Sequence, residues 1–178
     1  KDDYTPTLTS LVGALFQAFS LSVYELSLTP AIDLKGDLNT WVSENVRGLE
    51  NMENLFFKRL LVVEGFIVEN LRQSLNNIFA TTAVAEVRGM DIRTIVIPFV
   101  GTGDQGIVDT EIVPVLIDES KNALKTIAGL ERIIFCERNE KKAGIIFNEL
   151  NKVLNRATIE YSEEQIKTIV EPVLADLA

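Results

Sequence analysis

The residues best suited to binding a ligand lie in one stretch, IVIPFVGTGDQGI, at positions 95–107. An apolar, β-branched run leads there into Gly101, Gly103 and Gly106, with Asp104 between them. Glycine lets the backbone turn sharply and lets N–H groups come close to a ligand. Several N–H groups before a helix can hold a phosphate. The stretch therefore predicts an anion-binding loop, and the alternative is a strand-to-helix turn whose glycines only relieve steric strain.

Two established phosphate motifs can be compared with this loop. It formally satisfies G-x-G-x-x-G, in which the helix opens within the glycines and an acidic residue follows about 20 residues later. Here the expected helix cap is Asp109 or Thr110, and the candidate acid, Glu137, stands much further along the chain. A dinucleotide-binding fingerprint is therefore the weaker alternative. No Gly-Lys-Ser/Thr follows the glycines, which excludes a P-loop.

The side chains that are missing restrict the chemistry further. The chain has no histidine and a single cysteine, Cys136. A Ser-His-Asp or Cys-His pair, a histidine-based zinc site and an intrachain disulfide are all excluded. Any reaction must use carboxylates, water, backbone amides or groups of the substrate, so we expect no metal and no cofactor.

Charge and hydropathy restrict the partners and the compartment. The net charge of −9 argues against nucleic acid, whose binding depends largely on Lys and Arg contacts to phosphates. The apolar runs are far shorter than the roughly 20 residues of a membrane helix, so we expect no membrane segment within this chain. The lone cysteine favours a reducing compartment, and we expect the cytoplasm. The oligomeric state is left open.

Apolar periodicity places regular elements on both sides of the loop. Gly89 is expected to cap a helix in the left-handed conformation, and Pro98 to mark a strand end or an edge strand. Residues 27–37 predict a loop leading into a short strand, whereas residues 38–46 are compatible with either a strand or a helix. Helices are predicted over residues 8–19, 67–90, 111–127 and 139–156 and from residue 162, and strands over residues 57–64, 93–100 and 132–137.

From residue 57 onward the predicted elements alternate between strand and helix. Alternation of this kind is typical of an α/β domain with a largely parallel sheet and helices on its faces. Ligands bind such sheets beyond the carboxyl ends of the strands. The glycine loop follows directly after a predicted strand, so it should lie at that edge.

Four segments together resemble macro domains, a family that binds ADP-ribose: IVIPFVGTGDQGI, RIIFCERNEKKAGIIFNEL, FKRLLVVEG and SLVGALF. The first is similar to the family's second phosphate loop, and the second to the strand and last helix that follow that loop. The resemblance implies a three-layer α/β/α sandwich with a mostly parallel mixed sheet. The family's opening strands and adenine-binding Asp would precede Lys1, so the chain would be a divergent, N-terminally incomplete member.

The resemblance also implies ligand-binding residues on both sides of a diphosphate. The distal ribose end would lie near Phe135 or Cys136, although an apolar residue inside RIIFC also suits the core. Asp104 would bond a ribose hydroxyl or only stabilise the turn. The full predicted set is Ser10, Leu11, Val12, Gly13, Gly101, Thr102, Gly103, Asp104, Gln105, Gly106, Phe135 and Asn139. No catalytic residue is assigned.

The sequence thus predicts a nucleotide-binding domain over residues 1–156 and a helical extension or linker over residues 157–178. The expected function is a sensor of ADP-ribose or a related NAD-derived metabolite, attached to or partnered with an effector domain. Two alternatives stay open: an ADP-ribosyl hydrolase that uses substrate-assisted water, and an interaction module with a degenerate pocket. Trp41 could stack on a base or pack in the core, and Glu64 could act as a base or simply end a strand.

Overall fold

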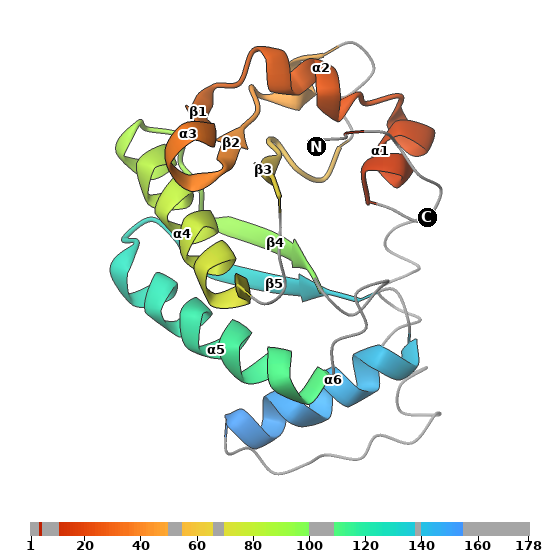
Figure 1. Cartoon of the computed structure of the whole chain (residues 1–178), viewed down its shortest axis with the longest axis vertical. Helices are drawn as coiled ribbons and strands as arrows, with labels where there is room; N and C mark the ends of the chain where they lie inside the picture. Colours follow the sequence, from red (N-terminus) through yellow and green to blue (C-terminus); the bar gives the residue numbers. More distant parts are fainter. Residues whose placement is uncertain are drawn as a thin grey trace.

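A computed structural model describes residue 4 and residues 11–49, 55–65, 70–99, 109–137 and 140–154 (Figure 1). The described part is a mixed α/β structure, which confirms the predicted class in its broad form. Its elements are, in chain order, α1 (Leu11–Phe19), α2 (Val23–Leu28), β1 (Ile32–Leu34), α3 (Lys35–Leu38), β2 (Thr40–Val42), the 3₁₀ helix η1 (Val46–Gly48), β3 (Leu61–Val63), α4 (Leu71–Val87), β4 (Thr94–Pro98), α5 (Asp109–Thr126), β5 (Arg132–Cys136) and α6 (Glu140–Val153).

The first sheet is antiparallel and has the order β1-β2-β3. Trp41 stands opposite Asp33 on one side and Val62 on the other. Just before β3 the pairing becomes irregular: the N–H of Leu60 donates to Oγ of Ser43 at 2.9 Å instead of to a carbonyl, although the N–H of Ser43 still donates to the carbonyl of Leu60 at 2.9 Å. Of the strand expected over residues 57–64, only Leu61–Val63 is regular.

The second sheet is the parallel pair β4–β5. Its register places Pro98 opposite Cys136, and the N–H of Phe99 donates to the carbonyl of Cys136 at 2.8 Å. β4 thus ends at Pro98, as predicted, and the last hydrogen bond of the pair comes from the next residue, Phe99. The two strands finish together at one edge.

The largest core lies between this parallel pair and helices α4 and α5. Leu75, Ile112 and Leu116 are almost fully buried there, and Ile97 contributes from β4. In the view of Figure 1, α5 and α6 lie below β4 and β5, and the antiparallel sheet lies above them. A carboxylate of α5, Glu119, is also buried and pairs with Arg72 of α4, which ties the two helices together.

The pairings among the described strands do not confirm a single, mostly parallel sheet. β3 was expected to run parallel to its neighbours, but it pairs antiparallel with β2. The short apolar strand LVV can join either kind of sheet, and here it pairs with β2. The predicted extension over residues 157–178, including the helix from residue 162, lies outside the described residues.

Helix α4 ends on a left-handed glycine, as predicted. Gly89 has φ of +76°, and its N–H donates to the carbonyl of Glu86 at 2.8 Å. The N–H of Met90 donates to the carbonyl of Ala85 at 3.0 Å, which completes a Schellman-type cap.

We expect Gly89→Ala to lower the free energy of unfolding by about 1–2 kcal/mol, because an L-residue is strained in the left-handed region. A new Cβ would meet no atom within 4 Å at this position, so the backbone conformation alone sets the cost. Gly144→Ala is the matched control: this glycine lies inside α6, also in open space, and alanine there should stabilise the protein by about 0.5–1 kcal/mol. In urea unfolding, the free energy of unfolding should fall for Gly89→Ala and rise for Gly144→Ala. The same change in both variants would contradict the left-handed cap at Gly89.

Candidate functional site

The carboxyl ends of β4 and β5 define the edge at which the sequence predicts a ligand. β4 ends at Pro98, α5 begins at Asp109, and the glycine loop lies between them in the chain. The predicted residues Gly101, Thr102, Gly103, Asp104, Gln105 and Gly106 lie outside the described residues, as do Ser10 and Asn139. Their proposed roles therefore stay predictions from the sequence.

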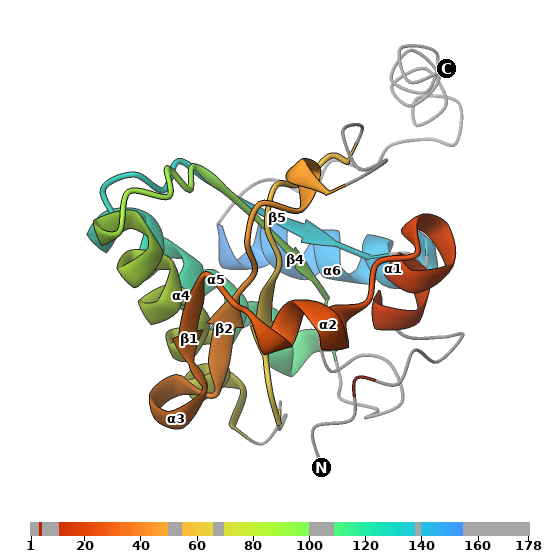
Figure 2. The ribbon, with the colours of Figure 1, turned by 90° about the horizontal axis from the view of Figure 1, so that it is seen from above.

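Helix α1 carries three of the predicted residues in its first turns. Leu11 is 57% exposed, Val12 is half-buried, and Gly13 is buried. Two perpendicular views place α1 on the side of the molecule toward which β4 and β5 point (Figures 1 and 2). Helix α1 and the ends of the parallel strands are thus on the same side. A ligand that contacts both α1 and the strand ends would require this arrangement.

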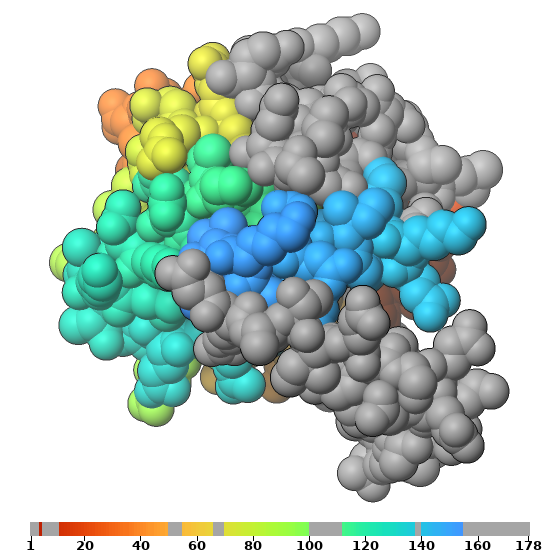
Figure 3. All heavy atoms as spheres, turned by 90° about the horizontal axis from the view of Figure 1, so that it is seen from below, coloured from red at the N-terminus to blue at the C-terminus, as the bar shows by residue number. Residues whose placement is uncertain are grey.

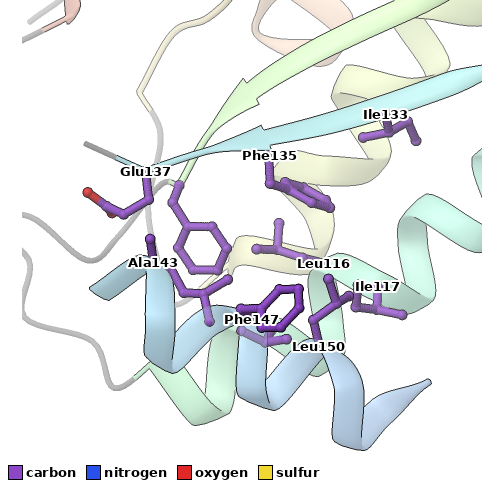
Figure 4. Close-up of a pocket in the computed structure, with 11 residues that line it drawn as sticks. Leu116, Ile117, Ile133, Phe135, Glu137, Ala143, Phe147 and Leu150 are labelled. Atoms are coloured by element: carbon purple, nitrogen blue, oxygen red, sulfur yellow. The ribbon is translucent and has the colours of Figure 1, made fainter. Parts of the chain in front are cut away.

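Phe135 is the predicted residue with the clearest surroundings. It packs against the large core and also lines a cleft of about 380 Å³ between β5, α5 and α6. Its ring meets that of Phe99 edge-on, with centroids 6.2 Å apart. Figure 4 shows the Phe135 side chain directed from β5 into the cleft, toward Phe147 and Leu150 of α6. Phe135 therefore takes part in the core and is also accessible from the cleft.

Cys136, the alternative to Phe135 at the ribose end, is exposed and follows Phe135 in the strand. Successive strand residues point to opposite faces, so Cys136 does not share the cleft with Phe135. It is absent from the residues that line the cleft.

Several residues that line the cleft were missed by the sequence reasoning. They come from the far wall, α6, where Ala143, Ile146, Phe147 and Leu150 recur at helical spacing. That spacing is visible in the sequence and predicts an inward face. It does not show that the face leaves space between the helix and β5.

A second cluster connects the N-terminal segment to the antiparallel sheet. The hydroxyl of Tyr4 donates to Oε1 of Glu64, and the same hydroxyl accepts a hydrogen bond from Nε1 of Trp41 at 3.0 Å. Trp41 is fully buried and meets the Tyr4 ring edge-on, and Nζ of Lys35 lies 5.8 Å from its ring centroid. Trp41 is thus a core residue, which confirms packing over stacking on a base.

Glu64 follows β3 and is half-buried. Its carboxylate accepts from Tyr4, and its own N–H donates to the carbonyl of Asn39 at 2.7 Å. The bond to Tyr4 ties the carboxylate to the N-terminal segment, and Glu64 does not line the cleft beside Phe135. The geometry therefore favours a role for Glu64 in anchoring Tyr4.

Burial and the bond to Glu64 raise the pKa of Tyr4 from 10.0 to about 12. Because the folded pKa lies above the ordinary tyrosine value, the stabilisation is complete below pH 10 and disappears as the pH rises toward 12. We expect Tyr4→Phe to destabilise the fold at pH 8 by about 1–3 kcal/mol, because it leaves the buried Trp41 N–H without its acceptor. The difference between wild type and variant in urea unfolding should shrink between pH 10 and 12. A constant difference over that range would contradict the hydrogen-bonded tyrosine.

The described residues were also searched for metal-binding groups and membrane-spanning helices. Within these ranges, no group of three or more Cys, Asp or Glu side chains is placed to hold a metal ion. No helix in the described part of the chain combines the length and hydropathy needed to cross a bilayer.

Comparison with models of known protein families gives no match for this chain, and comparison with curated proteins also gives none. The functional assignment therefore depends on the residues and on the geometry described above.

Proposed function

We propose that the protein binds ADP-ribose or a closely related nucleotide through its glycine-rich loop and acts as a ligand sensor. In this proposal the chain is a divergent macro-like domain, and its strands belong to a three-layer α/β/α sandwich. An attached or partner effector domain would read out the bound state, and we expect this to occur in the cytoplasm.

The observation that supports this proposal best is the shared end of β4 and β5. The strands run parallel and finish opposite each other, at Pro98 and Cys136, and the glycine sequence follows directly after the first of them. Open α/β sheets bind their ligands beyond such carboxyl ends. The strand, the glycine sequence and helix α5 follow one another in the order that a phosphate loop requires.

The ligand would then extend along this edge in a defined direction. Its diphosphate would rest on the amides of residues 101–106, with α1 at Leu11–Gly13 on the other side. Asp104 would accept a hydrogen bond from a ribose hydroxyl. The distal ribose would approach the end of β5 near Phe135 and stay outside the neighbouring apolar cleft, into which the Phe135 ring points.

A receptor is a better fit to these residues than a hydrolase. The chain contains no histidine, and Glu64, a candidate base, is bonded to Tyr4. A receptor should bind ADP-ribose without turnover, a hydrolase should release ADP-ribose from a modified protein over time, and an interaction module should bind no nucleotide.

A thermal-unfolding series with ADP-ribose, AMP, NAD and buffer separates these three functions. Binding to the folded state alone adds about 2.7 kcal/mol of stability at a ligand concentration 100 times Kd. We expect ADP-ribose to stabilise the protein and AMP to have little effect, since AMP lacks the diphosphate and distal ribose. A parallel incubation with an ADP-ribosylated protein should release no ADP-ribose; steady release would support the hydrolase instead.

A further inference from the structure

The cleft between β5, α5 and α6 is a second feature with the properties of a binding site. It has a volume of about 380 Å³, within the roughly 300–1,000 Å³ that is usual for small-molecule sites.

The chemistry of the cleft walls is uniform. Apart from Glu137, the lining side chains are all hydrocarbon: Phe99, Val113, Leu116, Ile117, Ile133, Phe135, Ala143, Ile146, Phe147 and Leu150. Figure 4 shows Leu116, Phe135 and Phe147 converging on the hollow, whereas the Glu137 carboxylate points away from it. A phosphate or a sugar placed among these residues would lose its hydration without gaining hydrogen bonds there.

We propose that this cleft binds a neutral aromatic or hydrocarbon group about the size of two fused rings. An apolar protein cavity of roughly 150 Å³ is large enough to bind benzene, and this cleft has more than twice that volume. Three phenylalanine rings in its wall suit offset or edge-on contacts with an aromatic ligand. This site goes beyond the proposed nucleotide function and does not depend on it.

The cleft can be reached from the surface along α6. Phe147 points into the cleft in Figure 4 and yet is 44% exposed, so the ring lies at the opening. The space-filling view of Figure 3 shows α6 at the surface beside α5.

The test uses N-phenyl-1-naphthylamine, an uncharged probe whose fluorescence rises in apolar surroundings. We expect saturable binding to the wild-type protein. Ala143→Phe should place a ring inside the cleft, leave too little room for two fused rings and weaken binding by about tenfold or more. Ile145→Phe is the matched control, because Ile145 lies on the same helix, is 47% exposed and does not line the cleft. It should leave the Kd unchanged. No binding to wild type, or equal binding by a folded Ala143→Phe variant, would overturn the proposal.

A second measurement needs no variant, in case Ala143→Phe fails to fold. The probe should shift the methyl resonances of Leu116, Ile117 and Leu150 in wild-type NMR spectra and leave those of Ile145 and Leu124 in place. If only the resonances of Ile145 and Leu124 shift, the proposal is overturned, as it is if the probe does not bind.

The apolar group could belong to the bound nucleotide or to a separate molecule, and one further titration distinguishes these sources. A change in the Kd of the probe on saturation with ADP-ribose assigns the group to the nucleotide. An unchanged Kd assigns it to a separate hydrophobic molecule. The probe titration without nucleotide still tests the cleft if ADP-ribose does not bind at all.

Discussion

Replacing Gly103 with valine is expected to abolish ADP-ribose binding while leaving the protein folded. A β-branched side chain would block the approach of the phosphates to the backbone amides of the glycine loop. Each charge-assisted hydrogen bond contributes about 1.5–3 kcal/mol, so losing two of them weakens binding by at least about 100-fold. Among the residues that the structure describes, the main core comes largely from α4, β4 and α5, and Gly103 is a glycine with no side chain to contribute to it. Calorimetry should therefore detect no heat of binding, and the thermal midpoint should stay close to that of wild type.

Gly36→Val is the matched control for this experiment. Gly36 lies in α3, on a side of the molecule away from the ends of β4 and β5, and a Cβ there would meet no atom within 4 Å (Figure 1). The same substitution at this glycine should leave the affinity for ADP-ribose unchanged. Retained binding by a Gly103→Val variant would remove the loop from the site.

Trp41→Ala is expected to have the largest effect on stability, a loss of about 3–5 kcal/mol. The indole is fully buried and packs with Leu15 and Val23. The substitution also removes the donor to Tyr4 and leaves a cavity in the middle strand of the antiparallel sheet. Domains of this kind have about 5–15 kcal/mol of stability in total, so the variant should unfold at a much lower urea concentration.

Val87→Ala provides the contrast, because Val87 is 89% exposed and should change stability by no more than about 0.5 kcal/mol. The slope of the unfolding curve should be the same in both variants. If Trp41→Ala unfolds at the same urea concentration as Val87→Ala, the packing assigned to the antiparallel sheet is wrong.

The parts of the fold that depend on local chemistry could be predicted from the sequence. The cap at Gly89 follows from glycine's freedom at positive φ. The proline in the apolar run indicated the end of β4, which is at Pro98. Helix α5 begins at Asp109, two residues before the predicted start at residue 111. Each of these features depends on residues close together in the chain.

Features that depend on distant partners could not be predicted in the same way. The direction of β3 is set by its pairing with β2, and nothing within LVV specifies it. The bond from Tyr4 to Glu64 joins residues far apart in sequence, in segments with no shared pattern. The cleft beside Phe135 depends on how closely α6 approaches β5, and helical periodicity does not report that distance.

The central claim is that this protein binds the diphosphate and distal ribose of ADP-ribose, and calorimetric titration of the wild-type chain with ADP-ribose tests it most directly. We predict saturable binding to one site at micromolar affinity or tighter, about −8 kcal/mol or more favourable, with AMP binding far more weakly. The absence of any heat with ADP-ribose, or equal affinity for AMP, would contradict the proposed function.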